Sequence, residues 1–477
     1  MPSRQDQLHS YQYAQQRVVA ALVSHDPDPH RSPLRRAGTT VLIGIVVAAL
    51  AVGGAAIYGL ITGRSSVNPK NEAVVFLEKG TGARYVYLKS DQKLHPVLNY
   101  ASGLLIADSA TPELKSASRE SLAQVPLGEP LGIPDAPDSL PAAKGGLLAN
   151  VWTVCSQSGQ PGATTPQSIL SIGAGVSGGT ELPQPRADTP ADELRGLLVT
   201  DPANRTFLIY NNKRFLVPAD RVQQTRVWFR WNQTAALPVA PAWINAVPIG
   251  ADLRAPAIQG YGQRSAAFPD LTVGLILRIE NAGNPSAQWG VVLNDGVADL
   301  TEVQASLMQA EPGAAPATPL ALSTYGNMTR SQTQLVADAN TAGLPAGLPV
   351  LLNGPDSVCL TSAGGEIRVQ IGPVLPPGVA VTGAPGASNS QQADRVHVPR
   401  GKGAVVVAAG SPTAPPGGGT VSIITDTGRR YALDSRALLS KLGYGNVEPQ
   451  SVPSQLVSLL PQGPALDPAR AREAAAR

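Results

Sequence analysis

Aromatic residues, charged residues and cysteine are all scarce in this chain of 477 residues. It has five Trp, eleven Tyr and five Phe, five His, two Cys and 15% charged residues. Lys and Arg number 37 against 34 Asp and Glu, so the net charge is only +3. Proteins that follow a nucleic-acid backbone concentrate Lys and Arg in a patch, and this balance gives no reason to expect one.

Glycine and proline, in contrast, are abundant. The chain has 48 Gly and 44 Pro, residues that break helices and turn the backbone. A mainly helical protein is therefore not expected. The 43% of apolar residues is enough to build folded cores, and at ~150 residues per domain the length suggests two or three domains.

One long apolar run stands near the N-terminus. Residues Gly38 to Ile61 read GTTVLIGIVVAALAVGGAAIYGLI, without a charge. At ~1.5 Å per residue this run exceeds the ~30 Å hydrocarbon thickness of a bilayer and predicts one transmembrane helix. A cleaved signal peptide is the alternative, but its apolar core is usually only about 7 to 15 residues long and lies closer to the start.

The charges that flank the predicted span indicate its orientation. Arg31, Arg35 and Arg36 precede it, whereas Arg64 and the more distant Lys70 follow it. Positive residues favour the cytoplasmic side, so we expect a cytoplasmic N-terminus and a C-terminal part beyond about residue 62 on the far side of the membrane.

Small residues recur every four positions on one face of the predicted span. This spacing lets two membrane helices approach closely, although Ala and Gly are common in such segments in any case. The candidate helix-packing face consists of Ala51, Ala55 and Gly59.

An amphipathic helix is expected before the span. Ser3 and Asp6 form a capping pattern at its start, and the Pro-rich stretch after His25 ends it. A single helix has no core against which to bury its apolar face. Its polar face is mostly Gln rather than Lys and Arg, which favours a protein partner over the membrane surface. The candidate docking residues are Leu8, Tyr11, Val18 and Leu22.

The two cysteines both follow the predicted span. In an oxidising compartment Cys155 and Cys359 are expected to form a disulfide, with two free thiols as the alternative. Closing a loop of about two hundred residues contributes at most ~4 to 5 kcal/mol in the chain-entropy model. Such a bridge implies a discontinuous domain with other segments inserted between its halves.

A short unit recurs along the C-terminal part. Four segments combine a strand, a polar turn and a second strand, as hairpins do: YVYLKSDQKLHPV from Tyr85, FLIYNNKRFLV from Phe207, WGVVLNDGVADL from Trp289 and VSIITDTGRRYAL from Val421. Three of them are followed by Pro, Gly and Leu at offsets 0, 2 and 5, starting at Pro126, Pro248 and Pro461. The third hairpin has no clear partner of this kind. We interpret the pattern as four diverged repeats.

These observations predict an α+β, β-rich fold. A transmembrane helix precedes a domain of four small repeats around a central β domain. The expected segments are 1–37 (cytoplasmic), 38–61 (span), 62–144 (repeat 1), 145–195 with 335–400 (central domain), 196–260 (repeat 2), 261–334 (repeat 3), 401–470 (repeat 4) and 471–477 (C-terminal tail).

Several motifs together resemble those of the EccB family, a membrane-anchored core component of the actinobacterial type VII (ESX) secretion system. The motifs are QLHSYQYAQQRVVAALVSHD and PLRR before the span, then YVYLKSDQKLHPVLNYASGLLI, PLGEPLGIPDAP, WTVC, VVLNDGVADL and LVSLLPQGPAL. The resemblance covers nearly the whole chain. It departs at Gln15, Gln16 and Arg17, where many family members are Arg-rich, and after Leu466, where this chain is short. These departures put the particular ESX system and the cytoplasmic docking in question.

The resemblance implies a scaffold in the inner membrane, with an elongated assembly domain in the periplasm. The partners that it implies are the EccC motor ATPase, the EccD and EccE membrane subunits, other EccB copies, the mycosin protease and membrane lipid. Some members of the family carry an ATPase label, so the residues of this chain need to be searched for a nucleotide site.

Nucleotide-binding motifs are weak in this sequence. A P-loop, G-x-x-x-x-G-K followed by Ser or Thr, does not occur. One G-x-G-x-x-G is present at Gly173, Gly175 and Gly178, but Pro183 and Pro185 follow it where a helix should begin. We therefore expect a loop here, and the sequence leaves open a nucleotide site of another kind.

Other candidate chemistry is equally thin. Beyond the N-terminal segment only His95 and His397 are present, and neither suggests a metal cluster or a Ser-His-Asp arrangement. We expect a structural role for His95, and we name no catalytic, cofactor-binding or metal-binding residue and no cofactor. The alternative to a scaffold is a membrane-anchored extracytoplasmic enzyme or cell-wall-binding protein, since small β-rich repeats also suit glycan recognition.

Overall fold

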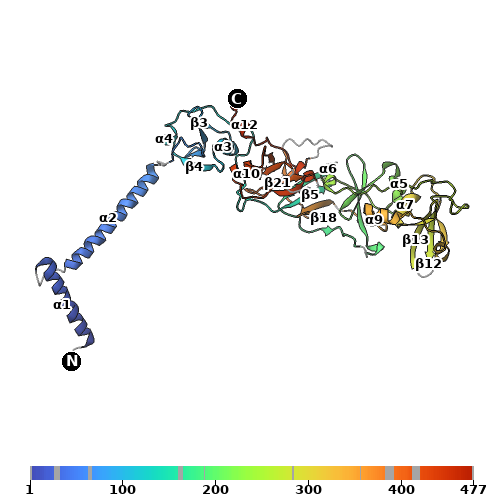
Figure 1. Ribbon diagram of the computed structural model, residues 1–477, viewed down its shortest axis with the longest axis horizontal. Coiled ribbons are helices and arrows are strands. Elements are labelled where there is room, and N and C mark those ends of the chain that lie inside the picture. Colours follow the sequence, from blue (N-terminus) through green and yellow to red (C-terminus); the bar gives the residue numbers. More distant parts are fainter. Residues whose placement is uncertain are drawn as a thin grey trace. The chain divides into compact units, whose positions relative to one another are not determined.

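The computed structural model describes most of the chain. It covers residues 3–25, 33–62, 67–158, 165–186, 189–281, 284–354, 356–381, 392–410 and 419–474. The chain divides into an N-terminal unit, residues 1–96 and 113–128, and a C-terminal unit, residues 97–112 and 129–477. The fold is mixed α+β and rich in strands, as expected (Figure 1).

Two long helices open the N-terminal unit: α1 (Arg4–Ser24) and α2 (Pro33–Thr62). The Ser3 hydroxyl accepts from the Asp6 N–H while the Asp6 carboxylate accepts from the Ser3 N–H, so the predicted capping box is present. His25 then takes a left-handed conformation and ends α1.

A four-stranded sheet, the first sheet, follows in the same unit. It consists of β1 (Val74–Glu78), β2 (Arg84–Leu88), β3 (Lys93–Pro96) and β4 (Glu113–Ala117), in the order β3-β2-β1-β4. Only the β1–β4 pair is parallel. Helix α4 (Arg119–Leu122) lies in the same unit, and Phe76, Leu94 and Leu122 belong to one buried cluster.

Three sheets of the C-terminal unit have this same strand order. The second consists of β8 (Arg195–Thr200), β9 (Thr206–Tyr210), β10 (Lys213–Val217) and β11 (Leu237–Pro238), with β16 (Val350–Leu351) added on β8. The third consists of β12 (Ile276–Asn281), β13 (Asn284–Val292), β14 (Val297–Leu300) and β15 (Thr318–Ala321). The fourth consists of β21 (Ala404–Ala409), β22 (Val421–Ile424), β23 (Arg430–Ala432) and β24 (Gln450–Pro453).

The four hairpin segments expected from the sequence each form an antiparallel pair: β2 with β3, β9 with β10, β13 with β14 and β22 with β23. The turn chemistry is as predicted at the second of them. Asn211 and Asn212 both have positive φ, 48° and 56°. A two-residue hairpin turn needs this conformation, and Asn tolerates it better than most residues.

A seven-stranded sheet is built from segments far apart in the sequence. Its order is β19-β20-β6-β5-β17-β18-β7. The strands are β5 (Val151–Gln157), β6 (Gln167–Ile172), β7 (Thr180–Glu181), β17 (Ser357–Ala363), β18 (Glu366–Ile371), β19 (Val379–Ala380) and β20 (Arg395–His397). Trp152 and Leu360 from this sheet share a buried cluster with Trp243 and Val406.

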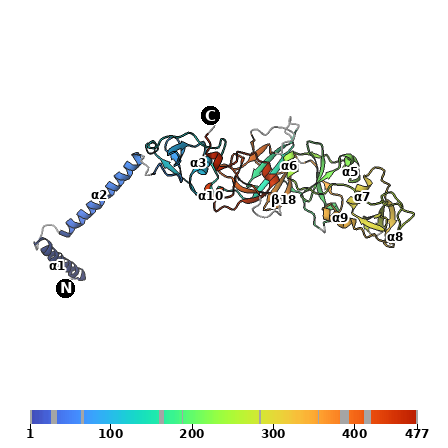
Figure 2. The same cartoon turned by 45° about the horizontal axis from the view of Figure 1, so that its top comes forward.

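The C-terminal unit also contains short helices. They are α3 (Tyr100–Ile106), α5 (Val222–Trp228), α6 (Pro241–Ala246), α7 (Glu302–Gln309), α8 (Leu322–Gly326), α9 (Leu335–Ala342), α10 (Leu438–Lys441), α11 (Ser454–Ser458) and α12 (Pro468–Ala471). Helices α7, α8 and α9 surround the third sheet (Figure 2). The C-terminal helix α12 packs on α3, where the Arg472 guanidinium donates to the Ile106 carbonyl.

Candidate functional site

The apolar helix α2 contains the predicted membrane span. Among the described residues one helix is long and apolar enough to cross a bilayer, with the span at Gly38–Tyr58 and a mean hydropathy of 2.5. Ala51 and Ala55 of the candidate packing face are exposed along it. The exposure of Gly59 lies outside what the structure describes.

The N-terminal helix α1 presents an uncovered apolar surface. All four candidate docking residues are more than half exposed: Leu8, Tyr11, Val18 and Leu22. These side chains remain available for a partner. An isolated helix gains little stability from apolar side chains that stay in water.

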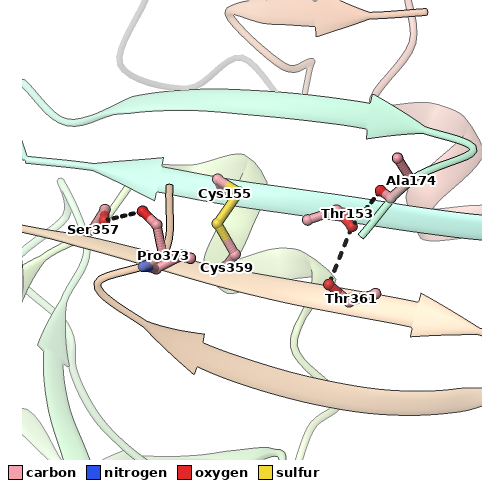
Figure 3. Close-up of a disulfide and its surroundings, with 7 residues drawn as sticks. All are labelled: Thr153, Cys155, Ala174, Ser357, Cys359, Thr361 and Pro373. Carbon is pink, nitrogen blue, oxygen red and sulfur yellow. Dashed lines mark hydrogen bonds between the residues drawn. A yellow bond between two sulfur atoms is a disulfide. The ribbon is translucent and has the colours of Figure 1, made fainter. Parts of the chain in front are cut away.

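The disulfide expected between Cys155 and Cys359 is present (Figure 3). The two cysteines lie directly opposite each other on the antiparallel strands β5 and β17, 204 residues apart in sequence, and both are fully buried. On the same pair of strands the Thr153 hydroxyl donates to the Ala174 carbonyl at 3.0 Å and lies 3.1 Å from the Thr361 hydroxyl. The bridge thus joins two central strands of the seven-stranded sheet.

The recurring Pro-x-Gly segments close the outer edge of three of the four-stranded sheets. Arg430 of β23 donates its N–H to the Pro461 carbonyl at 3.0 Å and accepts from the Gly463 N–H at 2.8 Å. Arg214 of β10 makes the same pair of bonds with Pro248 and Gly250, both at 2.8 Å. We call these three-residue stretches closing segments. The first sheet has one at Pro126–Gly128, bonded to Leu94.

Each glycine of these closing segments lies against the ring of the next strand residue. A Cβ added at Gly128 would come within 2.3 Å of the His95 ring. The corresponding contacts are 2.5 Å from Gly250 to Phe215 and 2.3 Å from Gly463 to Tyr431. Three rings are thus packed on backbone where no side chain fits, which explains why Gly recurs at this offset.

The third sheet also has a closing segment, which the sequence pattern missed. Val297 of β14 donates to the Thr329 carbonyl at 2.8 Å and accepts from the Ser331 N–H at 2.9 Å. The strand residue that follows is Ala298, which has no ring. Ser can therefore stand where the other segments need Gly. A small residue at this strand position could have indicated a closing segment without Gly. A search for Pro-x-Gly alone does not detect it.

The histidine is buried, and a strand follows the glycine-rich loop. His95 is 6% exposed, packs on Gly128, and has its Nε2 2.9 Å from the Asp91 carboxylate. Sequence reasoning overlooked Asp91, although it stands four residues earlier. Strand β7 follows Gly178, in place of the helix that a dinucleotide loop requires. Among the described residues no group of three or more metal-ligating side chains is found.

A large hollow of the C-terminal unit lies beside the third sheet. Its volume is about 790 Å³, and its lining includes Trp289, Asp299, Tyr325, Arg330 and Val336. The Tyr325 hydroxyl donates to the Asp299 carboxylate at 2.8 Å, and the Arg330 guanidinium pairs with the same carboxylate. Burial and the bond to Asp299 raise the pKa of Tyr325, so this phenol remains protonated.

The arrangement of these features defines a class of protein. It has an apolar helix suited to a membrane, exposed apolar side chains on the N-terminal helix α1, and a larger disulfide-bonded part built of sheets. These features are those of a membrane-anchored, disulfide-bonded and β-rich protein.

Comparison with known proteins identifies the family. The family model described as "Type VII secretion system ESX-1, transport TM domain B" matches residues 1–476. The chain therefore belongs to the EccB family of type VII secretion systems.

Relatives and solved structures agree with this membership. The chain is 27% identical to the ESX-3 secretion system ATPase EccB3 of Mycolicibacterium smegmatis, over 96% of this chain and 88% of that one. It is also 27% identical to the ESX-5 secretion system ATPase EccB5 of Mycobacterium marinum, over 98% and 93%. A chain of an intact ESX-5 inner membrane complex has the same fold, with a TM-score of 0.70, 22% identity and coverage of 100% and 96%. The EccB3 dimer from the ESX-3 core complex matches with a TM-score of 0.63, 26% identity and coverage of 84% and 100%.

Proposed function

We propose that this chain is a structural core subunit of a type VII secretion complex in the inner membrane. The observation that carries the proposal is the family match over residues 1–476, which includes the apolar helix and all the sheets. The similar structures come from an ESX-5 inner membrane complex and from an EccB3 dimer of an ESX-3 core complex, which supports membership of such an assembly.

The N-terminus lies in the cytoplasm in this proposal, and the chain after the span lies in the periplasm. Arg35 and Arg36 stand at the N-terminal flank of the span, on the side that positive residues favour. The disulfide supports the same orientation, because such bridges form and persist in oxidising compartments and are rare in the cytosol.

Helix α1, helix α2 and the part beyond the membrane each make different contacts in this proposal. The exposed apolar face of α1 docks on cytoplasmic parts of the membrane subunits, with EccC, EccD and EccE as the proposed partners. The small-residue face of α2 packs against another membrane helix. Further copies of this chain and a mycosin protease are the proposed partners of the part beyond the membrane. The similarity to a chain solved as an EccB3 dimer supports the contact between copies.

The four sheets of identical strand order are proposed to be four copies of one repeated unit. They would correspond to residues 62–144, 196–260, 261–334 and 401–470. The shared parallel fourth strand and the shared closing segment support this interpretation. The seven-stranded sheet is then the central domain, with 145–195 and 335–400 as its two halves joined by the disulfide.

An ATPase activity is the second candidate, because curated relatives are named ATPases. A nucleotide site would have to be of a kind without a P-loop. Measuring ATP hydrolysis by the purified full chain, with and without the rest of the complex, distinguishes the ATPase from the scaffold. We expect turnover to follow the motor subunit, and turnover by this chain alone would favour the enzyme.

Co-purification tests the scaffold role. The tagged full chain, solubilised gently from native membranes, should elute with other ESX subunits at a mass far above its own 49.3 kDa. A cell-wall-binding protein would instead pull down purified cell wall without other subunits.

A further inference from the structure

The third sheet leaves part of its outer edge open where the second and fourth sheets are closed. In the second sheet the Leu253 N–H donates to the Leu216 carbonyl at 2.8 Å, two residues beyond Arg214. In the fourth sheet the Leu466 N–H donates to the Ala432 carbonyl at 2.8 Å, two residues beyond Arg430. The Leu of the Pro-x-Gly-x-x-Leu pattern therefore makes a second contact with the strand edge.

The equivalent residue in the third sheet is Asp299, two residues beyond Val297. Both main-chain groups of Val297 point to the outer edge, since they bond Thr329 and Ser331. Alternate residues of a strand turn the same way, so the N–H and C=O of Asp299 also point outward. Among the described parts of the chain, no main-chain group bonds Asp299 from that side.

The local sequence explains why this edge stays open. The position that corresponds to Leu253 and Leu466 is Gln334, which immediately precedes helix α9. The chain turns into a helix there instead of continuing along β14. Two hollows, of about 790 and 530 Å³, remain beside the edge, and Asp299, Arg330 and Val336 line both.

The larger hollow has the size and chemistry of a peptide-binding pocket. Pockets for small ligands usually measure about 300–1,000 Å³. Leu300, Tyr325 and Val336 supply apolar lining, while the carboxylate of Asp299 is already satisfied by Tyr325 and Arg330. The outward N–H and C=O of the strand edge remain available to a ligand, and such groups are the basis of recognition by strand addition.

We propose that the edge of β14 at Asp299 binds an extended segment of a partner polypeptide, with a Leu-like side chain in the adjoining hollow. The segment accepts from the Asp299 N–H and donates to the Asp299 carbonyl. Its chemistry is that of the chain's own Pro-x-Gly-x-x-Leu segments, which occupy the same place in the second and fourth sheets. That the segment comes from a partner polypeptide rests on the proposed assembly role. The binding edge itself is a property of this chain alone.

A labelled peptide tests the proposal directly. The probe is a fluorescein-labelled nonapeptide with the sequence of residues 248–256, PIGADLRAP, and its control has Ala in place of Leu. Fluorescence anisotropy measures binding to the full chain in detergent. We expect saturable binding at millimolar or lower concentration, weakened by the Leu-to-Ala change.

Two variants, each with a matched control, locate the site. Asp299→Pro removes the outward N–H, and Asp299→Ala is its matched control because both remove the carboxylate. The Pro variant should bind about two- to tenfold more weakly than the Ala variant, as expected for one lost main-chain bond. Val336→Trp fills the hollow from α9 and should abolish binding. The same change at Val227, an exposed residue away from the hollow, should not.

Hydrogen exchange provides a measurement that does not depend on the proline variant folding. The Asp299 amide should exchange rapidly in the free chain and become protected when the peptide is added. Absence of saturable binding, equal affinity of the Pro and Ala variants, or no effect of Val336→Trp would overturn the proposal. Self-association that disappears in Val336→Trp would make the occupant a second copy and overturn the partner assignment. None of these outcomes bears on whether the chain co-purifies with a complex, so the scaffold role is tested separately.

Discussion

Substitution of Gly463 by Ala should destabilise the edge of the fourth sheet. The new Cβ would lie 2.3 Å from the Tyr431 ring, more than 1 Å inside ordinary van der Waals contact. Tyr431 is 4% exposed and Gly463 is itself buried, so the ring has little room to move. Overpacking of this kind typically costs about 1–3 kcal/mol, and we expect about 2 kcal/mol here.

Hydrogen exchange reports this loss at the affected bonds. The amides to follow are those of Arg430 and Gly463, which bond Pro461 and Arg430 at 3.0 and 2.8 Å. A local loss of about 2 kcal/mol should speed their exchange by roughly thirtyfold. Gly410→Ala is the matched control, because a Cβ at Gly410 would meet nothing within 4 Å.

A double-mutant cycle isolates the contact with the ring. Tyr431→Ala removes the ring and creates the small residue that the third sheet carries naturally at Ala298. In that background Gly463→Ala should cost less than about 0.5 kcal/mol, so the two changes should couple by about 1–3 kcal/mol. If Gly463→Ala behaves like the Gly410 control, or if its cost is unchanged without the ring, the packing explanation of the recurring Gly is wrong.

Three further predictions concern the bridge, the orientation and pH. Replacing both bridging cysteines by Ala should lower the unfolding temperature of the full chain and remove the mobility difference between oxidised and reduced samples on gels; identical mobility of the wild-type samples would argue against the bridge. A periplasm-active reporter fused after Lys70 should be active, and a silent one would reverse the proposed orientation. The hydrogen bond from the Ser331 hydroxyl lowers the pKa of Asp295, so its stabilising contribution is complete above the ordinary carboxylate pKa near ~4 and is lost as pH falls through the lowered value. The protection of the Gln332 amide, which bonds Asp295 at 3.2 Å, should therefore fall in acid when its exchange rate is divided by the intrinsic rate at each pH. Asp295→Asn should abolish this pH dependence of the protection, and a dependence that persists would assign it to another group.

Local patterns predicted the parts of the fold that depend on short-range chemistry. Turn residues such as Asn211 and Asn212 marked the hairpins, and an uncharged run marked the apolar helix. The pairing of Cys155 with Cys359 was also accessible, because the chain offers only these two cysteines. The hairpins and the apolar helix depend on residues close together in sequence. The disulfide could be predicted because two cysteines allow only one pairing.

The sequence did not predict features in which a residue at one position changes what is needed at a distant position. The closing segment of the third sheet has neither Pro nor Gly, because Ala298 removes the ring that makes Gly necessary. The parallel pairing of β16 with β8 joins segments about 150 residues apart and consists of only two residue pairs. Strand edges left open, such as that at Asp299, become visible only when the sheets are compared with one another.

The mass of the native particle decides whether this chain is a scaffold within a larger membrane complex. Membranes containing the tagged full chain would be solubilised gently, and the purified particle weighed and its subunits counted. We predict a particle much heavier than 49.3 kDa that contains more than one copy of this chain together with other ESX subunits. A single copy of the chain in its detergent micelle, with no other subunit, would contradict the scaffold role.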